Sequence, residues 1–85
     1  MNIIITVNEY TTGSGIQLHW EPGFKIECTT SPGEVLIRAN ADGLKSLANH
    51  CLTLAQEAAP KHVHIHLDAF NALEDGSATL IIEKV

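Results

Sequence analysis

The sequence predicts an α+β fold, a two-layer sandwich in which one amphipathic helix lies on one face of a mainly antiparallel sheet. Two observations predict this class. Segments with alternating apolar and polar residues fill the first part and the end of the chain, and a single long helical pattern separates them. The expected order of elements is therefore ββββαββ. With 85 residues, the chain is expected to form a single domain over residues 1–85.

Four strands are expected before the helix, because every second residue of each segment is apolar. They cover residues 2–7, 16–20, 24–28 and 34–39. Pro22-Gly23 places proline before glycine, which suits a type II turn, and a second such pair, Pro32-Gly33, leads into the last of these segments. We therefore expect the four strands to follow one another as an antiparallel meander.

The one helix is expected over residues 42–59, with Asp42 as its N-cap and Pro60 as its stop. At helical spacing, one broad stripe of its surface is apolar, formed by Leu44, Leu47, Ala48, Cys51, Leu54, Ala55 and Ala58. The opposite side carries Lys45, Asn49, Thr53 and Gln56. We therefore expect the apolar stripe to pack on the sheet. The helix is long enough for a right-handed crossover, which predicts that the strands on either side of it are parallel.

The last two strands are expected over residues 62–67 and 78–84. Pairing residues whose numbers sum to 145 places Val63, Ile65 and Leu67 opposite Ile82, Leu80 and Ala78, all on the helix side. The same pairing places His62 opposite Glu83, His64 opposite Ile81 and His66 opposite Thr79. The histidines of HVHIHLD are therefore expected on the face that the helix does not cover.

This row of histidines allows a metal-site interpretation. Neighbours on one face of a strand lie about 6.5–7 Å apart, so two imidazoles can share an ion, whereas His62 and His66, about 13 Å apart, cannot. Further ligands would have to come from Glu83, Asp68 or His19. A two-histidine, one-carboxylate iron site could use His64, His66 and Asp68. Such sites usually lie in a cleft that excludes water, and this chain is too short to close one.

Two other interpretations of the row remain open. In the first, the histidines line a half-exposed sheet surface and His62 forms an ion pair with Glu83. In the second, they belong to a surface that binds a protein partner or a second copy of the chain. That open face is expected to carry Ile4, Leu36, Arg38 and Ile81 as well. The candidate partner-binding residues are His62, His64, His66, Asp68 and Glu83.

Composition excludes several classes of protein. The net charge of −5 and the lack of a Lys/Arg cluster argue against a nucleic-acid partner, and fit a basic protein partner. The start MNIIITVNEY has no basic segment and only a short apolar run, so neither a signal peptide nor a membrane span is expected. Cys28 and Cys51 have apolar neighbours, and we expect two buried free thiols in a cytoplasmic protein.

Catalytic motifs are not expected. Ser14 in TGSG has no nucleophile elbow around it, and the glycines of TTGSG match no phosphate-binding loop. Cys51 falls on the helix stripe and is expected to be a core residue rather than a nucleophile, and His50 is expected at the edge of that stripe. We therefore expect neither an enzyme nor a cofactor.

A set of residues in the second half of the chain carries a family resemblance. The set comprises Gly43-Leu44, Leu47-Ala48, Leu54-Ala55, the run HIHLD at 64–68, Gly76-Ser77 and Leu80-Ile81-Ile82. In these residues the chain resembles the immunity protein 32 family of bacterial polymorphic-toxin systems. The resemblance implies a small cytosolic protein that neutralises a cognate toxin by binding it, and the acidic composition would suit a basic, nuclease-like toxin.

Overall fold

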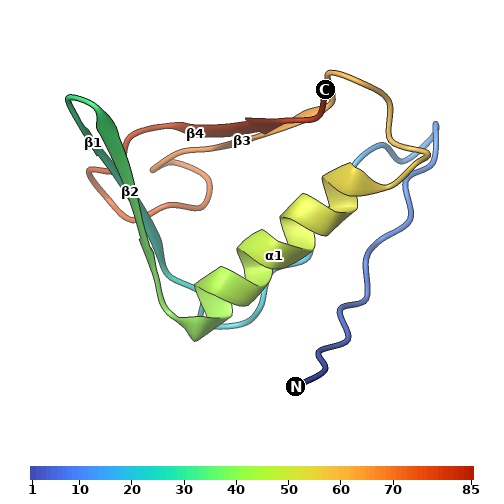
Figure 1. Cartoon of the computed structure of the whole chain (residues 1–85), viewed down its shortest axis with the longest axis horizontal. Helices are drawn as coiled ribbons and strands as arrows, with labels where there is room; N and C mark the ends of the chain where they lie inside the picture. Colours follow the sequence, from blue (N-terminus) through green and yellow to red (C-terminus); the bar gives the residue numbers. More distant parts are fainter.

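Two antiparallel hairpins and one helix make up the fold in the computed structural model, which describes residues 1–85. The elements are β1 (Ile26–Ser31), β2 (Glu34–Ala39), α1 (Ala41–Ala55), β3 (His64–Leu67) and β4 (Leu80–Glu83). Figure 1 shows the β1–β2 hairpin at one end, the β3–β4 hairpin across the top, and α1 running diagonally below it. The α+β class is confirmed. The six-strand order ββββαββ and the single-sheet sandwich are not, because four strands form two separate sheets.

The Pro32-Gly33 turn closes the β1–β2 hairpin, where the sequence places it. Gly33 has a φ of 81°, a left-handed conformation that glycine adopts without strain. Ile26 and Cys28 of β1 are buried, as the alternation of this segment predicts. The strand continues to Ser31 instead of ending at Cys28, because its pairing with β2 runs as far as the turn.

The edge of β1 that faces away from β2 is covered by the segment that leads into β4. The backbone N–H groups of Glu74 and Ala78 donate to the carbonyls of Ile26 and Cys28, at 2.9 and 2.7 Å. The hydroxyl of Ser77 accepts from the Cys28 N–H at 3.2 Å. Because these contacts occupy one side of the hairpin, β2 is its free edge.

The β3–β4 hairpin keeps the expected faces but not the expected pairs. Ile65 lies opposite Ile82, two residues further along than predicted, and His64 lies opposite Glu83. A shift of two residues leaves every side chain on its own face, so the apolar pattern could not distinguish the two pairings. The expected parallel pairing across the helix is wrong, because β2 and β3 belong to different sheets.

The predicted strands over residues 2–7 and 16–20 do not form. Before β1 the chain makes one isolated bridge, between Thr11 and Gly15. The alternation of IQLHW nevertheless predicts its orientation correctly, since Leu18 and Trp20 pack against the core while His19 is exposed. Apart from this bridge, residues 1–24 have no strand partner, and their backbone groups need other hydrogen-bond partners.

Helix α1 begins and ends earlier than the sequence predicts. Its N-cap is Asn40 rather than Asp42, and the Asn40 side-chain oxygen accepts from the Gly43 N–H at 2.8 Å and the Lys25 N–H at 3.0 Å. Asn40 is favoured as the N-cap because its side chain links the start of the helix to the residue before β1. The helix stops before Gln56, whose amide contacts the N-terminal segment, and not at Pro60.

The face of α1 that is buried differs from the predicted apolar stripe. The buried helix residues are Gly43, Ser46, Asn49, His50, Thr53 and Leu54. Several members of the expected stripe are exposed, namely Leu44, Ala48, Cys51 and Ala55. Cys28 is buried, as expected, whereas Cys51 is an exposed free thiol, so the expectation of two buried thiols is wrong for Cys51.

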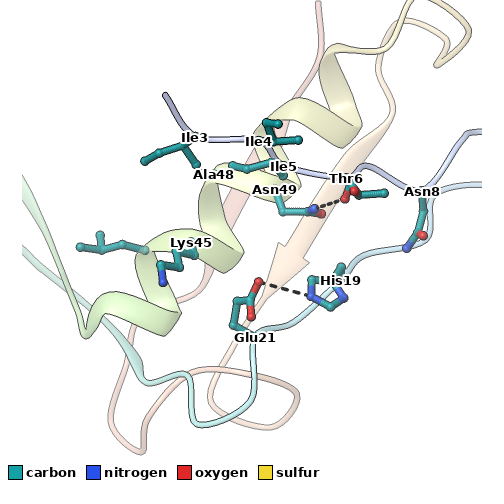
Figure 2. A pocket seen from close by; sticks show the side chains of 11 residues that line it. Ile3, Ile4, Ile5, Thr6, Asn8, His19, Glu21, Lys45, Ala48 and Asn49 are labelled. Carbon is teal, nitrogen blue, oxygen red and sulfur yellow. Dashed lines mark hydrogen bonds and ion pairs between the residues drawn. The ribbon is translucent and has the colours of Figure 1, made fainter. Parts of the chain in front are cut away.

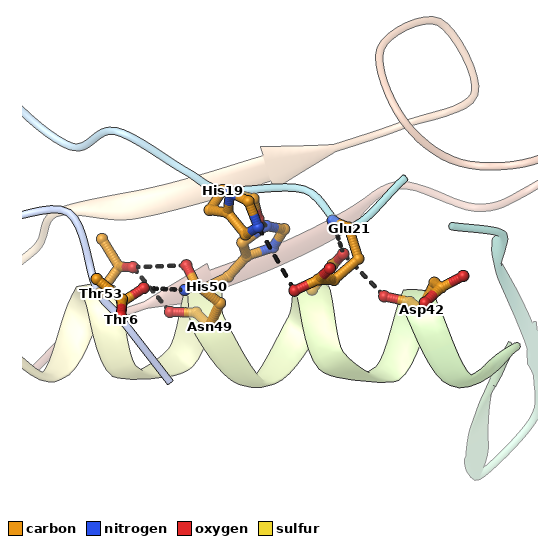
Figure 3. A network of polar contacts seen from close by, with 8 residues as sticks. Thr6, His19, Glu21, Asp42, Asn49, His50 and Thr53 are labelled. Carbon is orange, nitrogen blue, oxygen red and sulfur yellow. Dashed lines mark hydrogen bonds and ion pairs between the residues drawn. The ribbon is translucent and has the colours of Figure 1, made fainter. Parts of the chain in front are cut away.

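The polar face is buried because it satisfies the backbone of the N-terminal segment. Asn49 donates its side-chain amide to the Thr6 carbonyl at 2.9 Å (Figure 3). Ser46 accepts from the Glu21 N–H at 2.8 Å. Unpaired polar groups are costly when buried, and a leucine stripe would leave these groups without partners. Because no neighbouring strand satisfies the backbone of the N-terminal segment, the helix turns its polar face, and not its apolar stripe, toward this segment.

The apolar core lies between the helix and the two hairpins. It consists of Ile26, Cys28, Leu54, Ile65, Leu67 and Leu73. Half-buried Trp20 and Phe24, whose ring centroids lie 4.5 Å apart, pack against it. Helix α1 falls short of the length and apolarity needed to cross a membrane.

Removing one of the ties between the helix and the N-terminal segment has a predictable cost. We expect Asn49→Ala to lower the free energy of unfolding by about 1–3 kcal/mol, because the Thr6 carbonyl loses its donor in a part-buried site. Urea denaturation measures this change. Lys45→Ala, on the exposed side of the same helix, serves as the control and should change stability by less than about 0.5 kcal/mol. Equal effects of the two variants would show that the hydrogen bond between Asn49 and Thr6 does not stabilise the fold.

Candidate partner-binding site

The outward face of the β3–β4 hairpin carries the predicted histidine row. Ile65 and Leu67 point into the core, so alternation directs His64 and His66 outward, and both are exposed. Ile81 lies opposite His66 on this face and is 55% exposed. The structure therefore confirms that the row lies on an uncovered surface, and it places an apolar side chain within that surface.

Two histidine–carboxylate pairs flank this face. His62 Nδ1 lies 3.3 Å from Glu83 Oε2, and His66 Nε2 lies 3.4 Å from Asp68 Oδ2. The predicted contact between His62 and Glu83 is thus present, although Glu83 lies opposite His64 in the ladder. His62 reaches it from a left-handed backbone conformation with a φ of 72° just before β3. Exposed pairs of this kind contribute little to stability, about 0–1 kcal/mol.

The loop after β3 carries an exposed aromatic side chain. Asp68 Oδ1 accepts from the N–H groups of Phe70 at 2.9 Å and Asn71 at 3.1 Å, and the Asn71 side chain donates to the His66 carbonyl at 2.9 Å. Leu73 is buried and anchors the loop. Phe70, however, is 100% exposed. The sequence predicts from Phe70 and Leu73 that this linker tucks back or makes a helical turn, and for Phe70 the inward position is wrong. The spacing of Asp68 and Asn71 is a signal for the turn that leaves Phe70 outside.

The four residues that the sequence places on the open face beside the histidines do not lie together in the structure. Leu36 and Arg38 lie on β2 in the other sheet, and Ile4 lies in the N-terminal segment, so only Ile81 shares the β3–β4 face with the histidines. One continuous sheet would have been needed to bring all four side chains together.

The histidine row does not form a metal-ligand set. No three His, Cys, Asp or Glu side chains lie within reach of one ion. His19, considered as a further ligand, lies elsewhere and pairs with Glu21 at 3.5 Å. The metal-site interpretation therefore lacks the geometry it requires.

A groove of about 740 Å³ separates the N-terminal segment from α1 (Figure 2). Ile3, Ile4 and Ile5 line one wall, and Leu44 and Ala48 line the helix side. These helix residues belong to the stripe that the sequence placed in the core. The groove is mainly a consequence of the polar helix face being turned inward.

His50 is the one ionisable side chain buried in the helix packing, not a boundary residue as predicted. It is 0% exposed, and its Nε2–H donates to the His19 carbonyl at 3.0 Å. The Trp20 ring meets it edge-on at 4.3 Å, and Nδ1 has no hydrogen-bond partner. Burial lowers the pKa of His50 from its ordinary 6.5, a backbone hydrogen bond with His19 opposes this, and the His19 charge adds to the lowering.

The fold and this face define a small α+β protein with an exposed, mixed polar and apolar surface on its second hairpin. The family model described as immunity protein 32 matches residues 34–85. The chain therefore belongs to the immunity protein 32 family. No curated protein and no solved structure matches the chain. The matched residues extend from β2 to the end of the chain and include both α1 and the histidine row.

Proposed function

We propose that this protein neutralises a cognate toxin by binding it and covering a surface that the toxin needs. The observation that carries the proposal is the match of residues 34–85 to an immunity family, since immunity implies a protein partner. Membership of this family favours a non-enzymatic protein. In this proposal the protein acts in the bacterial cytoplasm as one half of a toxin–antitoxin pair.

The β3–β4 face is the proposed contact surface. It combines His62, His64, His66, Asp68 and Glu83 with the apolar Ile81. The exposed Phe70 lies in the loop after β3, two residues beyond Asp68, and aromatic residues are enriched at the centres of protein interfaces. The face therefore offers both an apolar contact and groups that select a charged partner.

The charge of the protein favours a basic toxin. The net charge is −5, and ten Asp and Glu residues outnumber five Lys and Arg residues. Opposite charge on two partners accelerates their association and disfavours like-charged competitors. A basic, nuclease-like toxin therefore suits this protein better than an acidic one.

Co-expression with the product of the neighbouring gene tests the proposed function. If that product is toxic, we expect this protein to restore growth and to co-purify with it as a stable complex. A neighbour that is not toxic, or a toxic neighbour that neither binds nor is neutralised, would contradict the proposal.

A further inference from the structure

Strand β2 is an exposed apolar edge. It pairs only with β1, and the other edge of β1 is already covered by the segment before β4. Val35 is 64% exposed, Leu36 51% and Ile37 41%. Natural proteins usually protect such edges with lysine, proline or a bulge, because an open edge accepts another strand. Residues 35–37 contain none of these.

Alternation along the hairpin shows which backbone groups face the open side. The carbonyls of Ile26 and Cys28 accept from Glu74 and Ala78 on the other side of β1, so the pairs that these two residues form with Ala39 and Ile37 are not hydrogen-bonded. In an antiparallel ladder such pairs recur at every second residue. The backbone N–H and C=O groups of the even-numbered residues of β2 therefore face β1. Those of Val35 and Ile37 point away from it.

We propose that this edge binds β2 of a second copy of the chain, antiparallel, about a two-fold axis at Leu36. Val35 then lies opposite Ile37 of the second copy, and the outward backbone groups of these residues exchange hydrogen bonds. Leu36 meets Leu36. The two hairpins join into one four-stranded sheet, and the exposed apolar residues of both copies are covered by each other.

The charges at the two ends of β2 select this partner and this register. Glu34 lies opposite Arg38 of the second copy, in a non-hydrogen-bonded pair, where cross-strand side chains lie closest. Arg38 is 70% exposed and has only one contact with a carboxylate, Glu27 at 3.8 Å. A shift that centres the axis on Ile37 would instead place Glu34 opposite Asn40 and Leu36 opposite Arg38. The strand is thus complementary to itself.

The association is expected to be weak and reversible. One added strand pair buries less surface than a standard interface, and two copies with a net charge of −5 repel each other at long range. Sedimentation equilibrium over micromolar to millimolar concentrations should therefore show the mass rising from that of one chain to that of two. A mass of one chain throughout this range would overturn the proposal.

Charge reversal tests the register. Glu34→Arg places arginine opposite arginine and should weaken the dimer at least tenfold, and Arg38→Glu should do the same with two glutamates. The double variant restores opposite charges and should recover most of the lost affinity. Glu57→Arg, at an exposed site just after the C-terminal end of α1, changes the net charge as Glu34→Arg does and should not weaken the dimer. A double variant as weak as the single ones would contradict this register.

A backbone variant separates dimer loss from misfolding. Val35→Pro removes an N–H that faces the open edge and no hydrogen bond of the β1–β2 ladder. We expect a folded monomer with an unchanged circular dichroism spectrum, and a folded dimer would overturn the proposal. The dimer does not depend on the proposed function: a chain that dimerises without binding a toxin, or the reverse, distinguishes the two.

Discussion

Replacing Gly43 with alanine is expected to destabilise the protein by about 3 kcal/mol or more. A Cβ at this position would lie 2.5 Å from the Lys25 carbonyl oxygen, 2.9 Å from Ile26 Cγ1 and 3.1 Å from Ala39 Cβ. The first of these atoms is backbone and the second belongs to a side chain that is 0% exposed, so neither can move away cheaply. The first turn of α1 would have to separate from the β1–β2 hairpin.

The sign of this effect is informative, because helix propensity predicts the opposite. Alanine is favoured over glycine in a helix by about 1 kcal/mol, so an exposed helix start would be stabilised. Gly13→Ala is the matched control, since nothing lies within 4 Å of a Cβ there. Urea denaturation of both variants gives the comparison. A Gly43→Ala protein as stable as the wild type would show that the helix does not pack this closely on the hairpin.

Acidification is expected to destabilise the protein through His50. Because burial lowers the pKa of His50 in the folded state, the unfolded chain, with a pKa near 6.5, binds the proton more readily. The stability that neutral His50 provides is fully present above pH 6.5. It is lost as the pH falls from 6.5 through the lowered pKa of the folded state.

Variants at His50 separate titration from packing. His50→Gln can still donate to the His19 carbonyl but cannot titrate, so the unfolding midpoint in urea should change less between pH 7.5 and pH 5 than in the wild type. His50→Ala should lose about 2–4 kcal/mol at pH 7.5, because it leaves a cavity beside Trp20 and an unpaired carbonyl. His64→Gln, at an exposed site, is the control. An unchanged pH dependence in His50→Gln would contradict this account.

Local alternation was predictable because it depends only on neighbouring residues. Ile26, Cys28, Ile65 and Leu67 point inward as the period of two requires, and His66 therefore points outward. The pairing of β3 with β4 was not predictable to better than two residues, since both registers keep the same faces.

The burial of the helix was not predictable from its own period. The spacing of leucines identifies a helix with an apolar stripe, but the face that is buried depends on what lies against it. Here Thr6 and Glu21, far away in the sequence, require the polar Asn49 and Ser46. Leu44 is left exposed, at 56%. Such long-range hydrogen bonds leave no trace in a local pattern.

The candidate site was predictable only in part. The histidines could be placed on an exposed face from alternation alone. The exposure of Phe70 depends on how the Asp68 carboxylate and the Asn71 amide fold the loop, and this could not be read from hydropathy.

The most direct test of the central claim compares two matched histidines in binding to the toxic neighbour. His66 and His19 are 52% and 51% exposed, and each lies near one carboxylate, but only His66 belongs to the β3–β4 face. Titration calorimetry should show that His66→Ala weakens binding while His19→Ala leaves it unchanged, and that adding Phe70→Ala to His66→Ala brings the loss to at least tenfold, which corresponds to about 1.4 kcal/mol. Full affinity in the double variant, or an equal loss in His19→Ala, would contradict the claim that this face binds the toxin.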